Sequence, residues 1–443
     1  MNSTAQLILE LQEARARLLE LVADLDDAQM LGPRLDIVNP LRWEIAHVAW
    51  FQEYWCLRHL RGFEPLRPLP HLHADKLYDS ARVAHDTRWD LPLPSKRDTL
   101  NYIQQILYRV LEEADKSLGE KVCDARGYDE AYFLTLALLH EDMHNEAITY
   151  TRQTLGYTQP QLPCSNDFSR SAVKTATTRG DAHIPGGTFM LGSKPEDGFV
   201  FDNEQWAYAV TVAPFAIACT AVSNAEFAAF VNDGGYARQE HWSDAAWEWR
   251  LNAQAQYPVY WQAAGKEQWQ RRVFDQWVAL EPELPVVHVN WYEAEAYCHW
   301  AKRRLPTEAE WELAACGEPA ADGKGLGIHK RRYAWGDEAP APERANLDWR
   351  GLSAVQDLPA GDSAFGCRQM IGNVWEWTAS EFQPYPGFAP GPYKEYSAPW
   401  FGDHRVLRGG CWATRARLMR GAYRNFYKPD RRDVWAGFRT CAL

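Results

Sequence analysis

The sequence predicts two domains of different class, an all-helical bundle followed by an α+β domain. Its 443 residues exceed the length at which one hydrophobic core usually stops growing. Helical periodicity runs through about the first 155 residues, whereas short strand-like segments separated by Gly, Pro, Asn and Asp dominate after about residue 182. Most of the 21 tryptophans follow residue 200, which is typical of long ordered loops fixed by large side chains.

Four long helices are expected in the first domain, because apolar residues recur there with the spacing of core-facing helices. Asn39 and Pro40 are interpreted as a capping residue and a proline at the first helical position, and Ser95 as the cap of the third helix. The expected helical ranges are 4–26, 39–60, 95–118 and 129–155. This order predicts a four-helix bundle over residues 1–160, with a long connection between its second and third helices.

The polar segment 161–182 lacks periodicity and is interpreted as a linker between the domains. In the second domain, residues 183–443, helices are expected near 223–231 and 291–304. Strands are expected in HIPGGTFMLG, YAVTVAPFAIA and RVLRGGCWA. These elements predict an α+β domain with a small sheet and much ordered loop.

Composition excludes several classes of partner. The formal net charge of −12 argues against a nucleic-acid or anionic-membrane surface, so a small-molecule substrate is expected. The first residues lack the pattern of a signal peptide, and no apolar run approaches the roughly 20 residues that span a bilayer. The nine cysteines include no C-x-x-C pair, which indicates reduced thiols. We therefore expect a cytoplasmic protein.

Three histidines suggest a metal site inside the bundle. His140 and His144 stand four residues apart on the fourth helix, so both imidazoles lie on one face. His47 shares an apolar stripe of the second helix with aromatic residues. A single histidine in such a stripe is usually a structural core residue, but two inward-facing histidine positions on separate helices favour a shared metal. Spacing alone does not distinguish Fe(II), Zn(II), Cu and Ni.

A zinc hydrolase is the competing interpretation of the same helix. His140, Glu141 and His144 also fit the H-E-x-x-H pattern, in which the glutamate activates zinc-bound water. The five-residue pattern is frequent by chance, and His47 lies upstream rather than downstream of it. A non-enzymatic protein is a further alternative, with a metal-buffering bundle and a carbohydrate-binding second domain.

Five phrases of the second domain together resemble the formylglycine-generating-enzyme-type sulfatase-modifying fold, a variant of the C-type-lectin fold. They are IPGGTFMLGS, PVVHVNWYEAEAYCHWAKRRLPTEAEWELAA, YAWGDE, GNVWEWT and VLRGGCW. The resemblance covers nearly all of residues 181–443. Formylglycine generation uses paired catalytic cysteines, and the sequence offers no such pair, since Cys411 stands alone in its phrase. That activity is therefore not expected.

A DinB-like bundle carrying three histidines, joined to this lectin-like domain, resembles the ergothioneine and ovothiol synthase family and the related selenoneine synthases. The resemblance covers the whole chain. It implies that His47, His140 and His144 bind Fe(II), that O2 is a co-substrate, and that hercynine is modified at the imidazole carbon between its nitrogens. No methyltransferase-like third domain is seen, so an ovothiol enzyme is expected less.

Differences from the sequence pattern of ergothioneine synthases indicate which compound donates the chalcogen atom. Met143 stands where the family typically has glutamine, and Tyr427 stands where it has aspartate. Arg82 and Arg88 are the arginines near the position of the pair that binds γ-glutamylcysteine carboxylates, and their spacing matches poorly. A donor without those carboxylates needs no such clamp. We therefore expect a selenosugar donor, as in selenoneine synthases, with γ-glutamylcysteine or cysteine as the alternative.

The resemblance also implies roles for residues of the second domain. Tyr385, in the YPGF phrase, matches the region of a catalytic tyrosine that supplies a proton or an electron, with Tyr393 and Tyr396 as alternatives. Asn425 and Phe426 match the segment that lines the betaine, where an aromatic face suits a trimethylammonium group. Tyr427 is then expected to face the donor.

Overall fold

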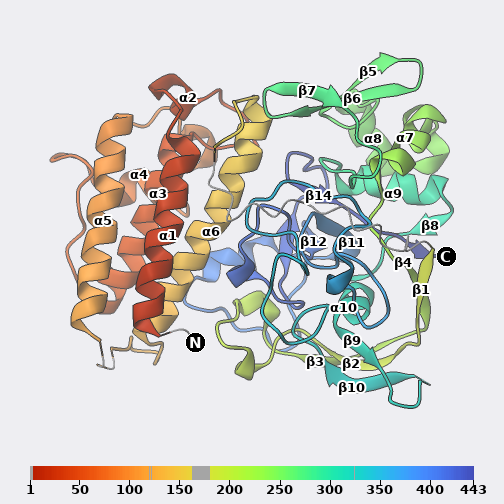
Figure 1. Ribbon diagram of the computed structural model, residues 1–443. Helices are drawn as coiled ribbons and strands as arrows, with labels where there is room; N and C mark the ends of the chain where they lie inside the picture. Colours follow the sequence, from red (N-terminus) through yellow and green to blue (C-terminus); the bar gives the residue numbers. More distant parts are fainter. Residues whose placement is uncertain (1–2, 119, 121, 162–179, 324) are drawn as a thin grey trace. The chain divides into compact units, whose positions relative to one another are not determined.

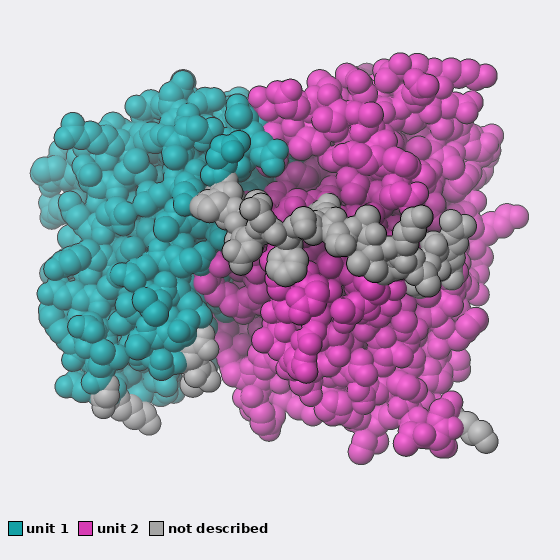
Figure 2. All heavy atoms as spheres, viewed as in Figure 1, with its two compact units in different colours: residues 1–163 teal, residues 164–443 magenta. Residues whose placement is uncertain are grey.

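The computed structural model describes residues 3–118, 120, 122–161, 180–323 and 325–443 (Figure 1). The chain divides into two compact units, residues 1–163 and 164–443, which Figure 2 distinguishes by colour. Most of the predicted linker, residues 162–179, lies outside the described residues. No helix among the described residues is both long and apolar enough to cross a bilayer.

Unit 1 is the predicted helical bundle, and its four long helices form because each carries an apolar stripe that packs against the others. α1 packs against α5 and α6, and α3 also packs against both. Shorter segments join the long helices. The elements are α1 (Thr4–Val22), α2 (Asp27–Leu31), α3 (Leu41–Glu53), the π-helical turn η1 (Tyr54–His59), α4 (Ala74–Tyr78), the 3₁₀ turn η2 (His85–Thr87), α5 (Lys96–Lys116) and α6 (Glu130–Leu155).

The capping predictions have different outcomes. Ser95 caps α5 as predicted, since its side chain accepts a hydrogen bond from the Asp98 amide. The prediction for Asn39 is wrong. The N-cap of α3 is Pro40, which has no side-chain cap, and the helix begins at Leu41. The Asn39 side chain instead contacts other polar groups of the bundle, which are described with the site below.

Unit 2 is an α+β structure whose strands form two four-stranded sheets and three smaller ones. One four-stranded sheet has the order β1 (Asp181–Ile184), β4 (Phe215–Ala218), β15 (Cys441–Ala442) and β8 (Arg303–Arg304). The other has the order β13 (Asn425–Tyr427), β12 (Arg405–Arg408), β11 (Trp375–Glu381) and β14 (Ala436–Gly437). β1 begins at Asp181, two residues before the predicted start of the second domain.

Figure 1 labels the strands of the smaller sheets and the helices of unit 2. The small sheets are β2 (Gly187–Leu191) with β3 (Tyr208–Val212), β9 (Gly317–Pro319) with β10 (Leu326–Lys330), and β5 (Trp261–Gly265) with β6 (Gln268–Val273) and β7 (Gln276–Ala279). The helices are α7 (Asn224–Asn232), α8 (Asp244–Asn252), α9 (Trp291–Trp300) and α10 (Glu308–Cys316). The two predicted helices correspond to α7 and α9, and the three predicted strand regions contain β1 to β4 and β12.

The cysteines of the described residues are free thiols. Cys123 is partly exposed, and the other described cysteines are buried: Cys56, Cys219, Cys298, Cys316, Cys367, Cys411 and Cys441. This agrees with the reduced thiols expected from the absence of C-x-x-C pairs.

Candidate metal centre

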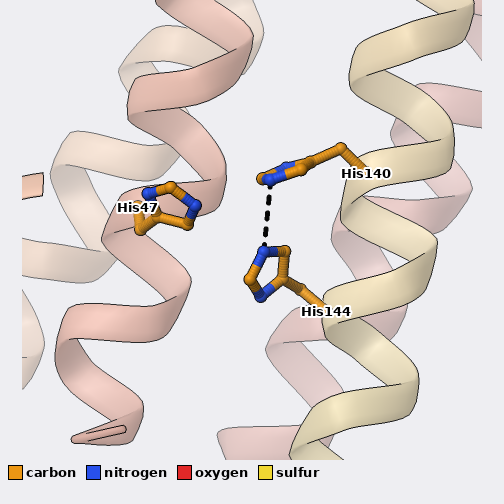
Figure 3. A group of neighbouring side chains, drawn as sticks. All are labelled: His47, His140 and His144. Atoms are coloured by element: carbon orange, nitrogen blue, oxygen red, sulfur yellow. Dashed lines mark hydrogen bonds between the residues drawn. The ribbon is translucent and has the colours of Figure 1, made fainter. Parts of the chain in front are cut away.

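Three histidines of unit 1 lie together between two helices of the bundle. α3 supplies His47, and α6 supplies His140 and His144. Their imidazole rings face one another (Figure 3), and one ring nitrogen of each lies within 4.8 Å of the other two. The Nε2 atoms of His140 and His144 are 3.2 Å apart. The predicted grouping of these side chains is found, and their role as metal ligands remains a prediction.

Aromatic rings enclose this group on the α3 side. The His47 ring stacks on Trp43, with centroids 4.9 Å apart and ring planes at 6°, and it lies 5.8 Å from Trp50. Phe51 stacks on His140 at 3.7 Å and 10°. His47 and His140 are almost fully buried, whereas the His144 side chain is 21% exposed. The histidines therefore lie in a largely apolar environment that reaches solvent at His144.

Hydrogen bonds orient two of the three rings. The Nδ1 atom of His47 lies 2.7 Å from the Tyr78 carbonyl oxygen, and Nδ1 of His144 lies 2.5 Å from Oε1 of Glu44. Because both partners are acceptors at neutral pH, each Nδ1 must carry the proton that it donates. In a neutral ring with its proton on Nδ1, Nε2 is the nitrogen that can act as a ligand. Such outer contacts from a carbonyl or a carboxylate are typical of metal-binding histidines.

The surroundings also set the charges. Burial lowers the pKa of His47 to about 3, with a further lowering by His144. Burial likewise holds the pKa of His140 well below its usual range. Burial alone would raise the pKa of Glu44, but the charge and hydrogen bond of His144 outweigh that effect and lower it to about 2. The lowered pKa values of His47 and His140 favour the neutral imidazoles that metal binding requires, and they lie beside an ionised carboxylate.

This donor set fits a divalent first-row transition metal. Three neutral imidazole nitrogens leave open coordination positions, which a metal needs in order to bind a substrate or activate a small molecule. Fe(II), Zn(II), Cu and Ni all accept imidazole ligands, so the geometry is compatible with iron without selecting it.

The Glu141 carboxylate is engaged in a buried ion pair. Arg15 of α1 donates to both carboxylate oxygens of Glu141, at 2.7 and 3.2 Å, and both side chains are buried. In the H-E-x-x-H reading this carboxylate would activate a metal-bound water. A carboxylate engaged by a guanidinium in this way is a poor general base, so the geometry disfavours the zinc hydrolase.

The predicted donor-binding residues of the bundle have different surroundings. Arg82 is exposed and its Nε lies 3.1 Å from Asp79. Arg88 is buried, with Nη1 donating to Asn39 and Nη2 to the Val83 carbonyl. These two arginines therefore do not present a matched pair of guanidinium groups. Met143 lies on α6 between the two histidines in sequence and is partly exposed.

The predicted betaine-lining segment forms strand β13 of unit 2. Antiparallel pairing places Phe426 opposite Val406 of β12 and Asn425 opposite Leu407. The Phe426 ring stacks on Phe382 at 4.0 Å and 12°. Tyr427 follows on the same strand, with the Arg431 guanidinium 5.1 Å from its ring centroid. These three consecutive residues form one short strand, in which Asn425 and Tyr427 point to one face and Phe426 to the other.

The candidate tyrosines lie in two environments. Tyr385 is 4% exposed, and its hydroxyl donates to Glu308 at 3.2 Å beneath the guanidinium of Arg424. Burial raises its pKa well above the usual range. Tyr396 instead contacts the ring of Phe426 at 5.7 Å. Of the two, Tyr396 therefore shares a cluster with the predicted betaine-lining segment.

Sequence reasoning did not identify the residues that support the histidines. Glu44 lies three residues before His47, and this spacing places both on one face of α3, so the sequence does contain a signal for it. Trp43, four residues before His47, was expected on the same stripe, but neither it nor Asn39 gives a signal for contact with Arg88. Their contacts depend on Arg88, which is about 45 residues away in the chain and reaches them only through the fold.

Comparison with family models divides the chain as the structure does. Residues 10–148 match the DinB superfamily, and residues 166–442 match the sulfatase-modifying factor enzyme 1-like domain. The predicted fold class, a DinB-like helical bundle followed by a formylglycine-generating-enzyme-type domain, is therefore confirmed.

Two relatives align with nearly the whole chain. The hercynine oxygenase of Mycolicibacterium thermoresistibile is 38% identical over 98% of this chain and 94% of its own length. The hercynine oxygenase of Mycobacterium tuberculosis is 36% identical over 99% of both chains. The formylglycine-generating enzyme of Streptomyces coelicolor is 35% identical, but over only 61% of this chain and 91% of its own. The similarity that covers nearly the whole chain is thus to hercynine oxygenases, whereas the formylglycine-generating enzyme matches only part of it.

Proposed function

This chain belongs to the hercynine oxygenase family, and from that premise we propose that it is an iron(II)- and O2-dependent enzyme that joins a chalcogen atom to the imidazole carbon of hercynine. The observation that carries the proposal is the group of His47, His140 and His144, whose ring nitrogens lie close together and two of whose rings are oriented by hydrogen bonds at Nδ1. Bound iron would supply the redox chemistry that activates O2 and would bring the reactants together.

The chain's own residues would hold and isolate this centre. Glu44 and the Tyr78 carbonyl accept from Nδ1 of His144 and His47, which would leave Nε2 of each neutral ring as the atom that binds the metal. Trp50 and Phe51 exclude water from the α3 side, which strengthens electrostatic interactions within the site. Asn425 and Phe426 would bind hercynine, with the aromatic face against the trimethylammonium group. Tyr427 and Met143 would lie toward the donor.

For the donor we favour a selenosugar over γ-glutamylcysteine or cysteine. Support comes from the two arginines of the connection between α4 and α5. Arg88 uses its Nη atoms within the bundle, and Arg82 is exposed beside Asp79. No pair of converging guanidinium groups in this connection is thus available for the two carboxylates of γ-glutamylcysteine, and a sugar does not require one.

A competition assay tests both levels of the proposal. The iron-loaded protein is given hercynine and O2 with equimolar selenosugar, γ-glutamylcysteine and cysteine, and the products are identified by mass spectrometry. We expect oxygen consumption that requires iron and hercynine, and a selenium-containing product in excess. A preference for γ-glutamylcysteine would reject the selenium donor alone. Absence of oxygen consumption with every donor would reject the oxygenase and favour a binding module.

Matched variants test the tyrosines. Tyr385→Phe and Tyr396→Phe each remove one hydroxyl and keep the ring. If Tyr385 acts in catalysis, its variant should lower kcat about 10²-fold or more, as loss of a general acid usually does. If only Tyr396→Phe lowers kcat, the role belongs to the tyrosine that contacts Phe426. Unfolding curves of both variants show whether loss of the Glu308 hydrogen bond has a structural effect instead.

A further inference from the structure

Arg88 contacts two residues that each support a different histidine of the metal centre. It belongs to the connection between α4 and α5, and it is 9% exposed. Its Nη1 atom donates to Oδ1 of Asn39 at 2.5 Å, and its Nη2 atom donates to the Val83 carbonyl at 3.3 Å. Its guanidinium carbon also lies 3.8 Å from the centroid of the Trp43 ring. A buried cation with these contacts is held in one orientation.

The first set of contacts leads to His144. Because the Asn39 oxygen accepts from Arg88, its amide nitrogen faces the other way and donates to Oε2 of Glu44. Oε1 of the same carboxylate then accepts the Nδ1 proton of His144 at 2.5 Å. Arg88 therefore determines which end of the Asn39 amide faces Glu44. That choice fixes the carboxylate that orients His144.

The second set of contacts leads to His47. The Arg88 guanidinium and the His47 imidazole both lie against the Trp43 ring, and the imidazole stacks on it at 4.9 Å with nearly parallel planes. Carbonyl groups at the end of α4 complete the arrangement. Leu77 accepts from Nε1 of Trp43 at 2.6 Å, and Tyr78 accepts from Nδ1 of His47 at 2.7 Å. The plane of the imidazole is thus fixed by the ring beneath it and by the carbonyl at its edge.

We propose that Arg88 is a positioning residue of the metal centre, which orients His144 through Asn39 and Glu44 and His47 through Trp43. The inference rests on the proposed function in taking the three histidines as metal ligands. It assigns Arg88 to metal retention rather than to the donor. Outer contacts of this kind typically contribute 10-fold to 100-fold to metal affinity.

The test measures metal binding directly, without substrate. Full-length protein freed of metal is titrated with Co(II) in competition with a chelator, and the visible Co(II) spectrum is recorded. Arg88→Met should weaken Co(II) binding about 10-fold to 100-fold and change the spectrum, because the imidazoles lose their fixed orientation. Arg88→Lys should recover only part of the affinity, since an ammonium group can lie over Trp43 but lacks the planar guanidinium fork.

Arg34→Met is the matched control. Arg34 also pairs with an oxygen acceptor, Asp90 at 2.6 Å, and lies over a tryptophan, Trp89 at 5.8 Å, but neither Asp90 nor Trp89 supports a histidine of the metal centre. The control should bind Co(II) as the unmodified protein does. Equal affinity and equal spectra for Arg88→Met and Arg34→Met would overturn the proposal.

A double-mutant cycle separates positioning from general destabilisation. Glu44→Gln interrupts the same hydrogen-bond chain. The double variant should therefore lose less Co(II) affinity than the product of the fold-losses of Glu44→Gln and Arg88→Met. If the fold-losses of Co(II) affinity multiply in the double variant, Arg88 does not orient His144 through Glu44. If Arg88→Met does not fold, the cycle is run with Arg88→Lys.

The outcomes also separate this inference from the proposed function. Unaltered binding by the Arg88 variants, together with hercynine turnover by the unmodified enzyme, rejects only the role of Arg88. Weakened binding by those variants without any hercynine turnover supports positioning and rejects the oxygenase. If the unmodified protein binds no Co(II), both are rejected.

Discussion

Glu53, the last residue of α3, is a buried carboxyl group that should give the protein a distinct pH dependence. Its side chain is 1% exposed and accepts a hydrogen bond from the Leu66 amide. Burial raises its pKa from 4.5 to about 7. Between these values the folded state holds a proton that the unfolded state has released. The contribution of Glu53 to the free energy of unfolding is therefore full below about pH 4.5 and is lost as the pH rises through about 7.

Replacing Glu53 with glutamine should remove this dependence, since the amide is neutral at every pH and its oxygen can still accept from Leu66. Relative to the unmodified protein, Glu53→Gln should gain stability between pH 5 and pH 8, by up to about 3 kcal/mol for a pKa shift of this size. Urea unfolding of both proteins at the two pH values measures the difference. The same difference in unfolding free energy at both pH values would contradict the assignment.

Asn39 illustrates what a local pattern cannot show at the level of one residue. An asparagine followed by proline commonly begins a helix, and that preference is a property of neighbouring residues. In the structure the amide is used by Arg88 and Glu44 instead. A local preference of about 1 kcal/mol is easily outweighed where an alternative contact satisfies buried charged groups. The three histidines could be predicted because helical spacing is itself local.

Among the helices, Arg15 connects all four long elements of the bundle. From α1 it pairs with Glu141 of α6, donates to the Ile103 carbonyl of α5, and donates to Gln52 of α3 at 3.1 Å. The ion pair is fully buried, so the loss of either partner would leave an uncompensated charge in the interior.

Arg15→Met should therefore lower the free energy of unfolding by about 3 to 5 kcal/mol. Arg17→Met is the control on the same helix, because Arg17 pairs with the more exposed Glu13 and should change stability by less than about 1 kcal/mol. Chemical denaturation of both variants provides the comparison. Similar losses for the two would show that the buried pair does not tie the helices together.

Helices could be predicted accurately where the apolar pattern repeats over many turns, and poorly where it covers only two or three. The four helices of unit 1 were found to within a few residues. Helices α8 and α10 of unit 2 were missed, because nine residues give little more than two turns of pattern. A start signal for α10 was present, since Thr307 and Glu310 form a capping box.

For the whole chain, the order of strands could not be predicted from sequence. β15, at the end of the chain, pairs with β4 and β8, and β14 pairs in parallel with β11. These partners are separated by tens to hundreds of residues, and strands of two residues carry no pattern of their own. The division into a bundle and an α+β unit was predictable, because it follows from composition and average periodicity over long segments.

Metal binding should protect one unit specifically. All three histidines belong to unit 1, so a bound metal stabilises the folded form of that unit by mass action. Hydrogen exchange followed by mass spectrometry should show slower exchange in α3 and α6 after Co(II) addition. The strands β11 and β12 provide the internal reference. Protection of the strands without protection of α3 and α6 would place the metal elsewhere.

The buried thiols have a consequence for chemical durability. O2 oxidises thiols and selenols to disulfides and selenenyl sulfides, and an accessible cysteine thiolate attacks such a bond, forming a mixed disulfide and releasing the other thiol or selenol. Burial raises the pKa of Cys316 and of Cys367 to about 12, so neither forms a reactive thiolate at neutral pH.

Iodoacetamide should accordingly alkylate Cys123 of the native chain well before Cys316 or Cys367, as peptide mapping would reveal. Equal labelling of all three would refute the idea. Burial in the interior thus protects these thiols from reaction. In a protein that works with reactive sulfur or selenium compounds, buried cysteines would not form mixed disulfides or selenenyl sulfides with those compounds. The protein would then remain unmodified over repeated turnovers.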